Sequence, residues 1–179
     1  MSVLVAYASR HGATRDIAER ISARLREAGQ TADAIPVTDI TDLSSYEGFV
    51  IGGAAYFGSW LKETTIFVRR HQAKLVGKPV WLFSSGPLGT ETKDRQGRDM
   101  LEAAEPKEWA EFKQAIEPRG TRVFYGALDP ARLRPSERLV RALPAGRALL
   151  PEGDFRQWHD IDAWADTIVE QLAAIAIPA

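Results

Sequence analysis

Cysteine is absent from the 179 residues of the chain. Its absence excludes a disulfide framework, a thiolate nucleophile, a Cys-ligated zinc and a protein-ligated iron–sulfur cluster. The three histidines do not have the H-x-x-x-H spacing of a metal site, so no metal is expected. If the protein carries out redox chemistry, the electrons must therefore reside on a bound organic cofactor.

The chain also lacks an excess of either charge and any long apolar run. It has 23 Lys and Arg against 24 Asp and Glu, which argues against generic binding of nucleic acid. No apolar run approaches the roughly 20 residues of a membrane span, and no basic segment precedes an apolar signal core. We expect a cytoplasmic protein whose residues 1–179 form a single domain.

Short apolar runs alternate with amphipathic helical patterns along the chain. The runs that predict buried strands are Val3–Ala8, Phe49–Gly53, Pro79–Ser85 and Thr121–Leu128, and Thr31–Val37 is an edge strand because of Pro36. Helical patterns begin at Thr14, after Trp60, at Pro106 and at about Asp154. This order predicts an α/β fold, a doubly wound parallel sheet with helices on both faces.

The loop Ser9-Arg10-His11-Gly12-Ala13-Thr14 joins the first strand to the first helix. Unpaired N–H groups and the positive end of the helix dipole make such a junction a potential anion site. Neither the G-x-G-x-x-G motif of dinucleotide-binding folds nor the P-loop motif of nucleotide triphosphatases is present. The alternative is that the hydroxyls of Ser9 and Thr14 only cap the helix.

The sequence S-R-H-G-A-T resembles the flavodoxin phosphate loop, Ser/Thr-x-Ser/Thr-G-x-Ser/Thr, with His11 in place of the usual hydroxyl residue. The flanking V-A-Y-A-S and R-D-I-A-E-R-I segments share the resemblance. It implies a flavodoxin-like sandwich with a five-stranded parallel sheet of order 2-1-3-4-5. It also implies that Ser9, Arg10, His11, Gly12, Ala13 and Thr14 bind the 5′-phosphate of FMN.

In that fold the cofactor lies at the carboxyl ends of the central strands, where two further loops meet the phosphate loop. The resemblance therefore assigns to the flavin ring the residues Ala54, Ala55, Tyr56, Phe57, Gly58 and Trp60, together with Ser85, Gly86, Pro87, Leu88 and Gly89. The alternative is that these aromatic residues pack against the next helix, and for Trp60 this alternative is favoured. No catalytic side chain is singled out, because N5 of the flavin would carry the chemistry.

Charge is unevenly distributed along the chain. Seven arginines against Asp129 and Glu137 give residues 119–147 a net charge of +5, and the remainder of the chain carries −6. Residues 129–153 are expected to form an irregular, Arg-rich insertion, with Arg134, Arg138 and Arg141 as candidates for docking an anionic substrate, a protein partner or a membrane surface that carries quinone. The alternative is a solvated surface whose arginines pair with acidic residues.

The segments F-Y-G-A-L-D-P-A-R-L, E-R-L-V-R-A-L and G-D-F-R-Q-W-H-D-I-D-A-W-A are similar to the pattern of the menaquinone-dependent protoporphyrinogen oxidase family of haem biosynthesis. This similarity implies an FMN oxidoreductase that passes electrons from a porphyrinogen to a quinone, with a homodimer and contact with the inner face of the membrane as further expectations. One alternative is an electron carrier that docks redox proteins, although the carriers of the flavodoxin family are strongly acidic. The other is a binding module without flavin.

Overall fold

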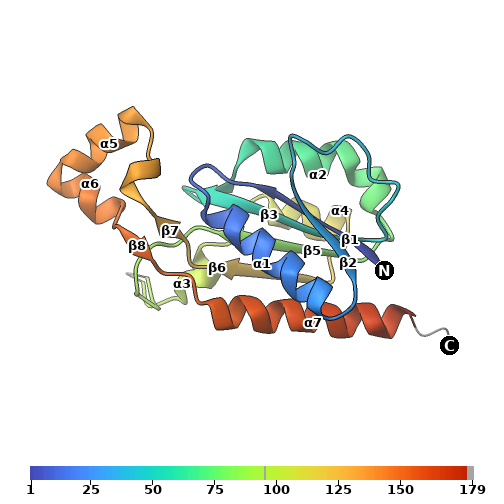
Figure 1. Ribbon diagram of the computed structural model, residues 1–179. Helices are drawn as coiled ribbons and strands as arrows, with labels where there is room; N and C mark the ends of the chain where they lie inside the picture. Colours follow the sequence, from blue (N-terminus) through green and yellow to red (C-terminus); the bar gives the residue numbers. More distant parts are fainter. Residues whose placement is uncertain (95, 177–179) are drawn as a thin grey trace.

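A computed structural model describes residues 1–94 and 96–176. Its main sheet has the order β2-β1-β3-β5-β6, with all neighbouring pairs in this order parallel (Figure 1). The strands are β1 (Ser2–Ala8), β2 (Thr31–Pro36), β3 (Gly48–Tyr56), β5 (Val80–Ser85) and β6 (Gly120–Phe124). The expected flavodoxin order of five parallel strands is therefore confirmed, with β2 at an edge as Pro36 predicted.

Residues of each central strand alternate between two hydrophobic clusters, one on each face of the sheet. In β1, Val3 and Val5 face one cluster, whereas Leu4 and Ala6 face the other. This is the two-residue period of a strand that is covered on both sides, and it explains why the central strands read as continuous apolar runs.

Helices cover both faces of the sheet (Figure 1). The first layer consists of α1 (Ala13–Glu27) and α7 (Trp158–Ala176), and the second contains α2 (Lys62–Leu75) and α4 (Trp109–Ala115). The short α3 (Met100–Ala103) lies between β5 and α4 in the chain. Ion pairs of 2.6 Å between Arg20 and Asp162 and of 2.8 Å between Arg24 and Asp166 join the exposed edges of α1 and α7. No helix among the described residues is long and apolar enough to cross a membrane.

Two adjacent glycines in β3 permit close packing on opposite faces of the sheet. A Cβ on Gly52 would overlap the ring of Phe83, and a Cβ on Gly53 would lie 2.6 Å from Thr64 Oγ1. The glycines therefore allow a bulky ring from β5 and the start of α2 to approach the β3 backbone.

Three two-residue strands were not expected as separate elements. Ser59–Trp60 (β4) folds back on β3 as a hairpin, and Ala127–Leu128 (β7) pairs with Gly153–Asp154 (β8) in an antiparallel ribbon. The expected strand Thr121–Leu128 is therefore broken after Phe124. The last helix begins at Trp158 and not at about Asp154, because Asp154 belongs to β8.

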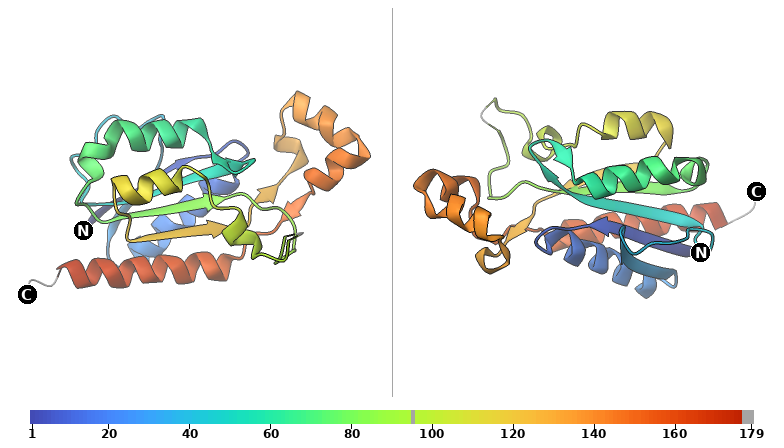
Figure 2. Two further views of the ribbon diagram at one scale, coloured as in Figure 1. Left: turned by 180° about the vertical axis from the view of Figure 1, so that it is seen from behind. Right: turned by 90° about the horizontal axis from the view of Figure 1, so that it is seen from above.

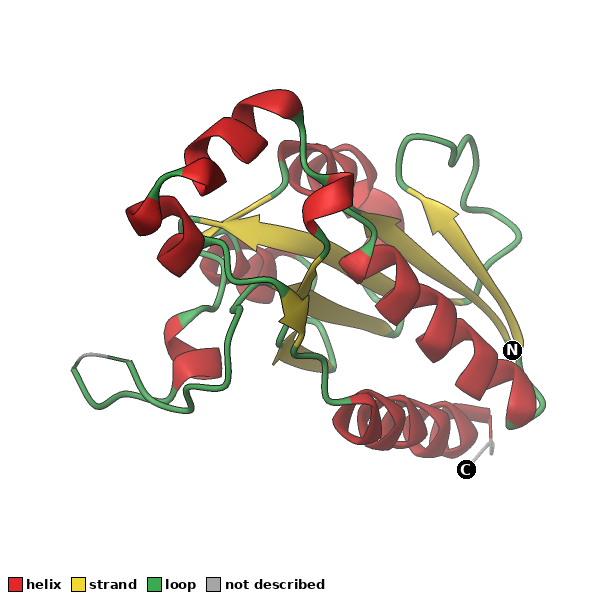
Figure 3. Ribbon diagram, turned by 60° about the vertical axis from the view of Figure 1, so that its left-hand side comes forward, coloured by secondary structure: helices red, strands yellow, loops and turns green. Residues whose placement is uncertain are grey.

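Residues 129–152, which we call the arm, connect β7 to β8. The expectation that this segment is irregular is wrong: it contains a 3-10 turn at Pro130–Arg132 and the helices α5 (Pro135–Ala142) and α6 (Pro144–Leu149). A proline at N1 or N2 starts each of these elements, a position that a helix tolerates because the N–H there has no intrahelical acceptor. The arm projects from the body of the protein in Figure 1 and in both views of Figure 2, and Figure 3 shows the fold turned so that this side comes forward.

Candidate functional site

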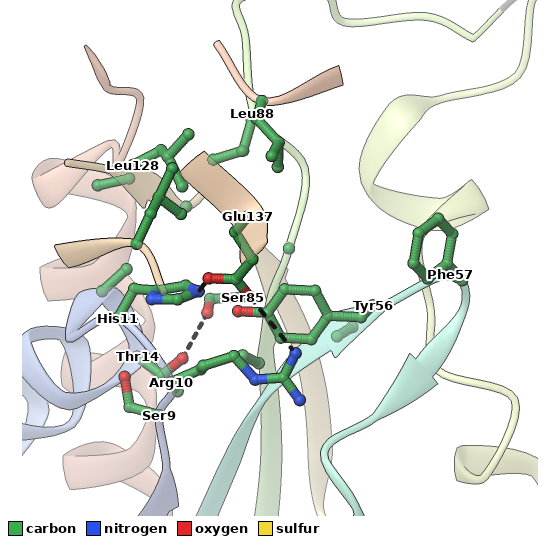
Figure 4. Close-up of a pocket in the computed structure, with 18 of the residues that line it drawn as sticks. Ser9, Arg10, His11, Thr14, Tyr56, Phe57, Ser85, Leu88, Leu128 and Glu137 are labelled. Atoms are coloured by element: carbon green, nitrogen blue, oxygen red, sulfur yellow. Dashed lines mark hydrogen bonds and ion pairs between the residues drawn. The ribbon is translucent and has the colours of Figure 1, made fainter. Parts of the chain in front are cut away.

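A cavity of about 220 Å³ lies where the carboxyl ends of β1, β3 and β5 meet the arm (Figure 4). Most of its lining is apolar, and its polar groups come chiefly from the loop after β1. The lining residues are Ser9, Arg10, His11, Ala13, Thr14, Ala54, Ala55, Tyr56, Phe57, Ser85, Gly86, Leu88, Gly126, Ala127, Leu128, Leu133, Glu137, Val140 and Leu150. Twelve of these were predicted from the sequence, so the structure brings together all three expected loops.

The loop after β1 presents an uncapped helix start. Gly12 is the N-cap of α1, with a φ of 96° that favours glycine, and no side chain caps the helix. The Ser9 hydroxyl accepts a hydrogen bond of 3.0 Å from the N–H of Gly12 and so closes the loop on itself. The first-turn N–H groups of an α-helix have no intrahelical acceptor, so this geometry leaves donors for an anion.

The Thr14 hydroxyl has a partner inside the protein. Its hydroxyl and the hydroxyl of Ser85 are 2.7 Å apart, and both side chains are buried. This hydrogen bond joins the first turn of α1 to the end of β5 and fixes two of the cavity's walls relative to each other. The alternative weighed from the sequence, in which the hydroxyls of Ser9 and Thr14 only cap the helix, is wrong, because no side chain caps α1. The two hydroxyls instead bond to Gly12 and to Ser85.

Tyr56 and Phe57 come from the tip of the β3–β4 hairpin. Ala55 pairs with Trp60 and Tyr56 with Ser59, so Phe57 and Gly58 form a two-residue turn in which both have positive φ, 52° and 72°. Such turns match the twist of the strands, but they normally carry Asn or Gly at the first position. Phe57 is fully exposed at this strained position. Its side chain therefore makes no packing contact that stabilises the hairpin.

Arg10 lies above the ring of Tyr56, with 4.7 Å between the guanidinium carbon and the ring centroid. Burial raises the pKa of the Tyr56 hydroxyl, although the nearby Arg10 acts in the opposite direction. Tyr56 therefore remains a neutral hydrogen-bond donor at physiological pH.

Glu137 of α5 reaches from the arm into the cavity (Figure 4). Its carboxylate lies 3.3 Å from His11 Nε2 and 3.9 Å from Arg10 Nη1. The second nitrogen of the ring, Nδ1, lies 3.0 Å from the Arg132 carbonyl oxygen. Because a carbonyl only accepts, Nδ1 is the donor, and the ring links the loop after β1 to two parts of the arm.

Five of the residues assigned to the cofactor from the sequence do not line the cavity. Gly12 lies on the far side of the loop, and Gly58 is at the exposed tip of the hairpin. The Pro87 carbonyl accepts a hydrogen bond of 2.8 Å from Gly126, and Gly89 is in the loop that follows. Trp60 is 4% exposed and so buried in the core, as the alternative reading predicted. Its ring packs edge-on against Trp109 of α4, with centroids 5.6 Å apart, whereas the sequence suggested packing against the next helix.

The three arginines proposed for docking differ in their surroundings. Arg141 donates to Glu152 at 3.0 Å and to the Leu150 carbonyl at 3.2 Å, and Arg138 donates to the Ala131 carbonyl. Two of the three therefore hold the arm together. Arg134 is exposed and makes no ion pair with a described residue.

Sequence reasoning missed the cavity walls formed by the loop after β6 and by the arm. Gly126, Ala127 and Leu128 follow β6, and the carboxyl-end rule that located the other loops would have found them. No local pattern indicates Glu137, because its contact with His11 depends on how the arm folds back. Within residues 1–94 and 96–176, no group of three or more acidic or histidine side chains is placed to hold a metal ion.

Comparisons with known proteins agree with this geometry. The family model described as "Flavodoxin domain" matches residues 4–143. Protoporphyrinogen IX dehydrogenase (quinone) of Escherichia coli strain K12 is 30% identical over 86 residues, which cover 47% of this chain and 48% of that protein. The chain thus aligns with about half the length of the curated relatives it matches.

Two solved structures illustrate the breadth of the fold. A flavodoxin from the domain Archaea has a TM-score of 0.60 at 16% identity, over 97% of this chain and 99% of that one. The Flv1 flavodiiron core of Synechocystis sp. PCC6803 has a TM-score of 0.64 at 11% identity, over 98% of this chain and 36% of that one. With the sheet order and the family match over residues 4–143, these results establish that the chain belongs to the flavodoxin domain family.

Proposed function

We propose that the protein is an FMN-dependent oxidoreductase whose flavin lies in the cavity at the carboxyl ends of β1, β3 and β5. The observation that carries the proposal is the junction of an uncapped helix start with an apolar cavity that has an aromatic hairpin on one side. FMN combines the same two chemistries, a phosphate and a flat, largely apolar ring system.

The loop after β1 fits a phosphate. The N–H groups at the start of α1 after Gly12 are free to donate to a phosphate, and the Arg10 guanidinium adds further donors. The His11 ring lies beside the same carboxylate, that of Glu137. The hydroxyl missing at position 11 is thereby replaced by an imidazole.

The remaining walls fit a ring system. Tyr56 and Phe57 supply aromatic surface, Leu88 and Leu128 supply apolar surface, and the backbone around Gly86 supplies N–H and C=O groups for a polar edge. The volume of about 220 Å³ is below the roughly 300–1,000 Å³ of typical ligand pockets. We infer that Glu137 and Val140, which enter from the arm, move outward when the ligand binds.

A bound flavin would supply one- and two-electron transfer, which no side chain of this chain provides. The roles of the chain's own residues are to bind the phosphate, to orient the ring and to limit access of water. The neutral hydroxyl of Tyr56 can donate a hydrogen bond to an acceptor in the cavity.

Two observations favour a porphyrinogen as electron donor and a quinone as acceptor. The Escherichia coli relative carries that activity in its name, and the arm adds apolar and cationic surface beside the cavity. Leu139 and Leu143 are 73% and 62% exposed, and arginines surround them. An electron carrier that docks redox proteins is the second candidate, supported by the likeness to flavodoxins over nearly the whole chain.

The decisive experiment is steady-state oxidation of protoporphyrinogen IX by the FMN-loaded protein with a menaquinone analogue as acceptor. We expect porphyrin to form in proportion to enzyme and to quinone. Flavin-loaded protein that reduces a redox protein but leaves the porphyrinogen unchanged would favour the carrier. A purified protein that binds no flavin would reject both.

The docking role of the arm needs a refined test. Reversal of Arg141 would break its contact with Glu152, so a loss of activity there would not separate docking from arm structure. Arg134→Glu is the cleaner change, because that side chain makes no ion pair with a described residue. If it contacts an anionic substrate, we expect a raised KM with little change in kcat.

A further inference from the structure

One side of α5 exposes two leucines. Leu139 and Leu143 are 73% and 62% exposed, and their i, i+4 spacing puts both side chains on the same side of the helix. Single exposed apolar residues are common on proteins, whereas neighbouring ones mark an interaction site. We call this side the outer face of α5; its residues, all exposed, are Pro135, Arg138, Leu139, Ala142 and Leu143.

The body of the protein does not cover the outer face. Glu137 and Val140, on the other side of α5, line the cavity, whereas neither leucine lines it. The arm also projects away from the sheet and its helices (Figures 1 and 2). The outer face is therefore free to contact a partner.

An arginine-lined hollow adjoins the outer face. Its volume is about 390 Å³, and Arg138 and Ala142 belong both to its lining and to the outer face. The full lining is Pro130, Ala131, Leu133, Arg138, Arg141, Ala142 and Arg147. Three guanidinium groups thus border one concave surface, and no acidic residue lines it. Such a surface attracts anions.

The acidic residues of the arm do not neutralise this hollow. Each has a partner elsewhere: Asp129 lies 3.6 Å from Arg132, Glu137 lies 3.3 Å from His11, and Glu152 lies 3.0 Å from Arg141. Arg147 makes no ion pair with a described residue, and Arg138 uses its hydrogen bond on the Ala131 carbonyl. The guanidinium groups of Arg138 and Arg147 therefore keep their charge for an external anion.

The chemistry of this surface favours a lipid bilayer over a protein. Protein interfaces draw their binding energy chiefly from Trp, Tyr and Arg, with Leu under-represented, and the outer face has no aromatic residue. Aliphatic side chains next to arginines are typical of helices that lie in the interface of an anionic membrane.

We propose that the outer face of α5 binds the surface of a bilayer that contains anionic phospholipids. Leu139 and Leu143 enter the boundary between headgroups and acyl chains, and Arg138 and Arg147 contact lipid phosphates. The binding is reversible and needs both contributions, because a single weak anchor does not hold a protein on a membrane. This inference does not depend on the proposed flavin function.

Vesicle flotation of the full chain tests the proposal. We expect the protein to float with vesicles of phosphatidylcholine and phosphatidylglycerol in equal amounts, and to bind phosphatidylcholine alone at least about tenfold more weakly. At about 1 M salt, binding to the mixed vesicles should fall toward the level for phosphatidylcholine, because salt at that concentration screens exposed charges.

Two variants separate the contributions. Leu139→Ser combined with Leu143→Ser should lower the partition coefficient about tenfold or more. Arg147→Gln should lower it about fivefold, and only with vesicles that contain phosphatidylglycerol. The matched controls are Val76→Ser and Arg70→Gln, the same kinds of change at exposed residues of the body, and both should bind as the unaltered protein does. Circular dichroism should confirm that every variant folds.

Protein that stays in the soluble fraction with both kinds of vesicle would overturn the inference and leave the proposed flavin function intact. A double leucine variant that floats like the unaltered protein would also overturn it. Sedimentation equilibrium tests for a second copy on the outer face: a dimer that the double variant abolishes would assign the leucines to a protein contact instead. A protein that floats with anionic vesicles but binds no flavin would overturn the proposed function alone.

Discussion

The Glu137 carboxylate lies 3.3 Å from His11 Nε2, although the two residues belong to distant segments of the chain. The His11 side chain is 7% exposed and that of Glu137 is 24% exposed, so the pair is partly shielded from solvent. The carboxylate therefore faces the loop at which a phosphate would bind. The Glu137 carboxylate and a bound phosphate would therefore compete for the Arg10 guanidinium and repel each other.

The first prediction concerns this competition. Glu137→Gln removes the negative charge but preserves the shape of the side chain. The variant protein should therefore bind FMN about two- to fivefold more tightly, because a partly exposed ion pair contributes a free energy of that size. Riboflavin lacks the phosphate and should bind as it does to the unaltered protein. Calorimetric titration with both ligands measures the difference. Weaker binding of both would show instead that Glu137 accepts hydrogen bonds from the ribityl chain.

The second prediction concerns Phe57, the exposed aromatic residue at positive φ. Phe57→Asn places a residue that tolerates this conformation at the turn, so the free energy of unfolding should not fall by more than about 0.5 kcal/mol. The affinity for FMN should fall by up to about tenfold, because the stacking surface is lost. Val76→Asn, a change at another exposed apolar residue, is the control and should leave the affinity unchanged. An unchanged FMN affinity in Phe57→Asn would exclude Phe57 from the site.

The parts of the fold that the sequence predicted are those in which local patterns and tertiary packing agree. The apolar run of β1 and the i, i+4, i+8 spacing of Ile17, Ile21 and Leu25 on α1 indicate their elements directly, and all these helix residues are fully buried. The carboxyl-end rule then placed three loops at one edge of the sheet, where they line one cavity.

The parts that the sequence did not predict depend on contacts between distant residues. Strands of two residues, such as β7 and β8, are too short to show a period, and their pairing is decided by where the arm returns. Trp60 comes from the hairpin that forms the site, yet its ring turns into the core against Trp109. Its direction follows from the β3–β4 register, which no pattern in the sequence indicates.

The third prediction addresses the paired glycines of β3. Gly52→Ala should lower the free energy of unfolding by about 1–3 kcal/mol, because the new Cβ overlaps the Phe83 ring in a core without space to receive it. Gly48→Ala in the same strand is the control. The nearest atom to its new Cβ would be 3.5 Å away, an ordinary contact, so the free energy of unfolding should change little. Urea denaturation measures both. Adding Phe83→Leu to Gly52→Ala should recover part of the lost free energy of unfolding. If the double variant is no more stable than Gly52→Ala alone, strain in the β3 backbone, and not the ring contact, causes the loss.

The fourth prediction concerns pH and the segment that leads from the arm to α7. Arg156 lies 2.7 Å from Asp154 and 3.0 Å from Asp16, and its hydrogen bond lowers the pKa of Asp154. A carboxylate with a lowered pKa in the folded state stabilises the fold above its ordinary pKa of about 3.9, and this contribution is lost as the pH falls through the lowered value. Arg156→Gln should therefore reduce the free energy of unfolding by about 1 kcal/mol at pH 7 and by less at pH 3. Urea denaturation at the two pH values provides the measurement. A loss of equal size at both would indicate that Arg156 acts by packing over the Trp158 ring, 4.5 Å from its centroid, and not through its charge.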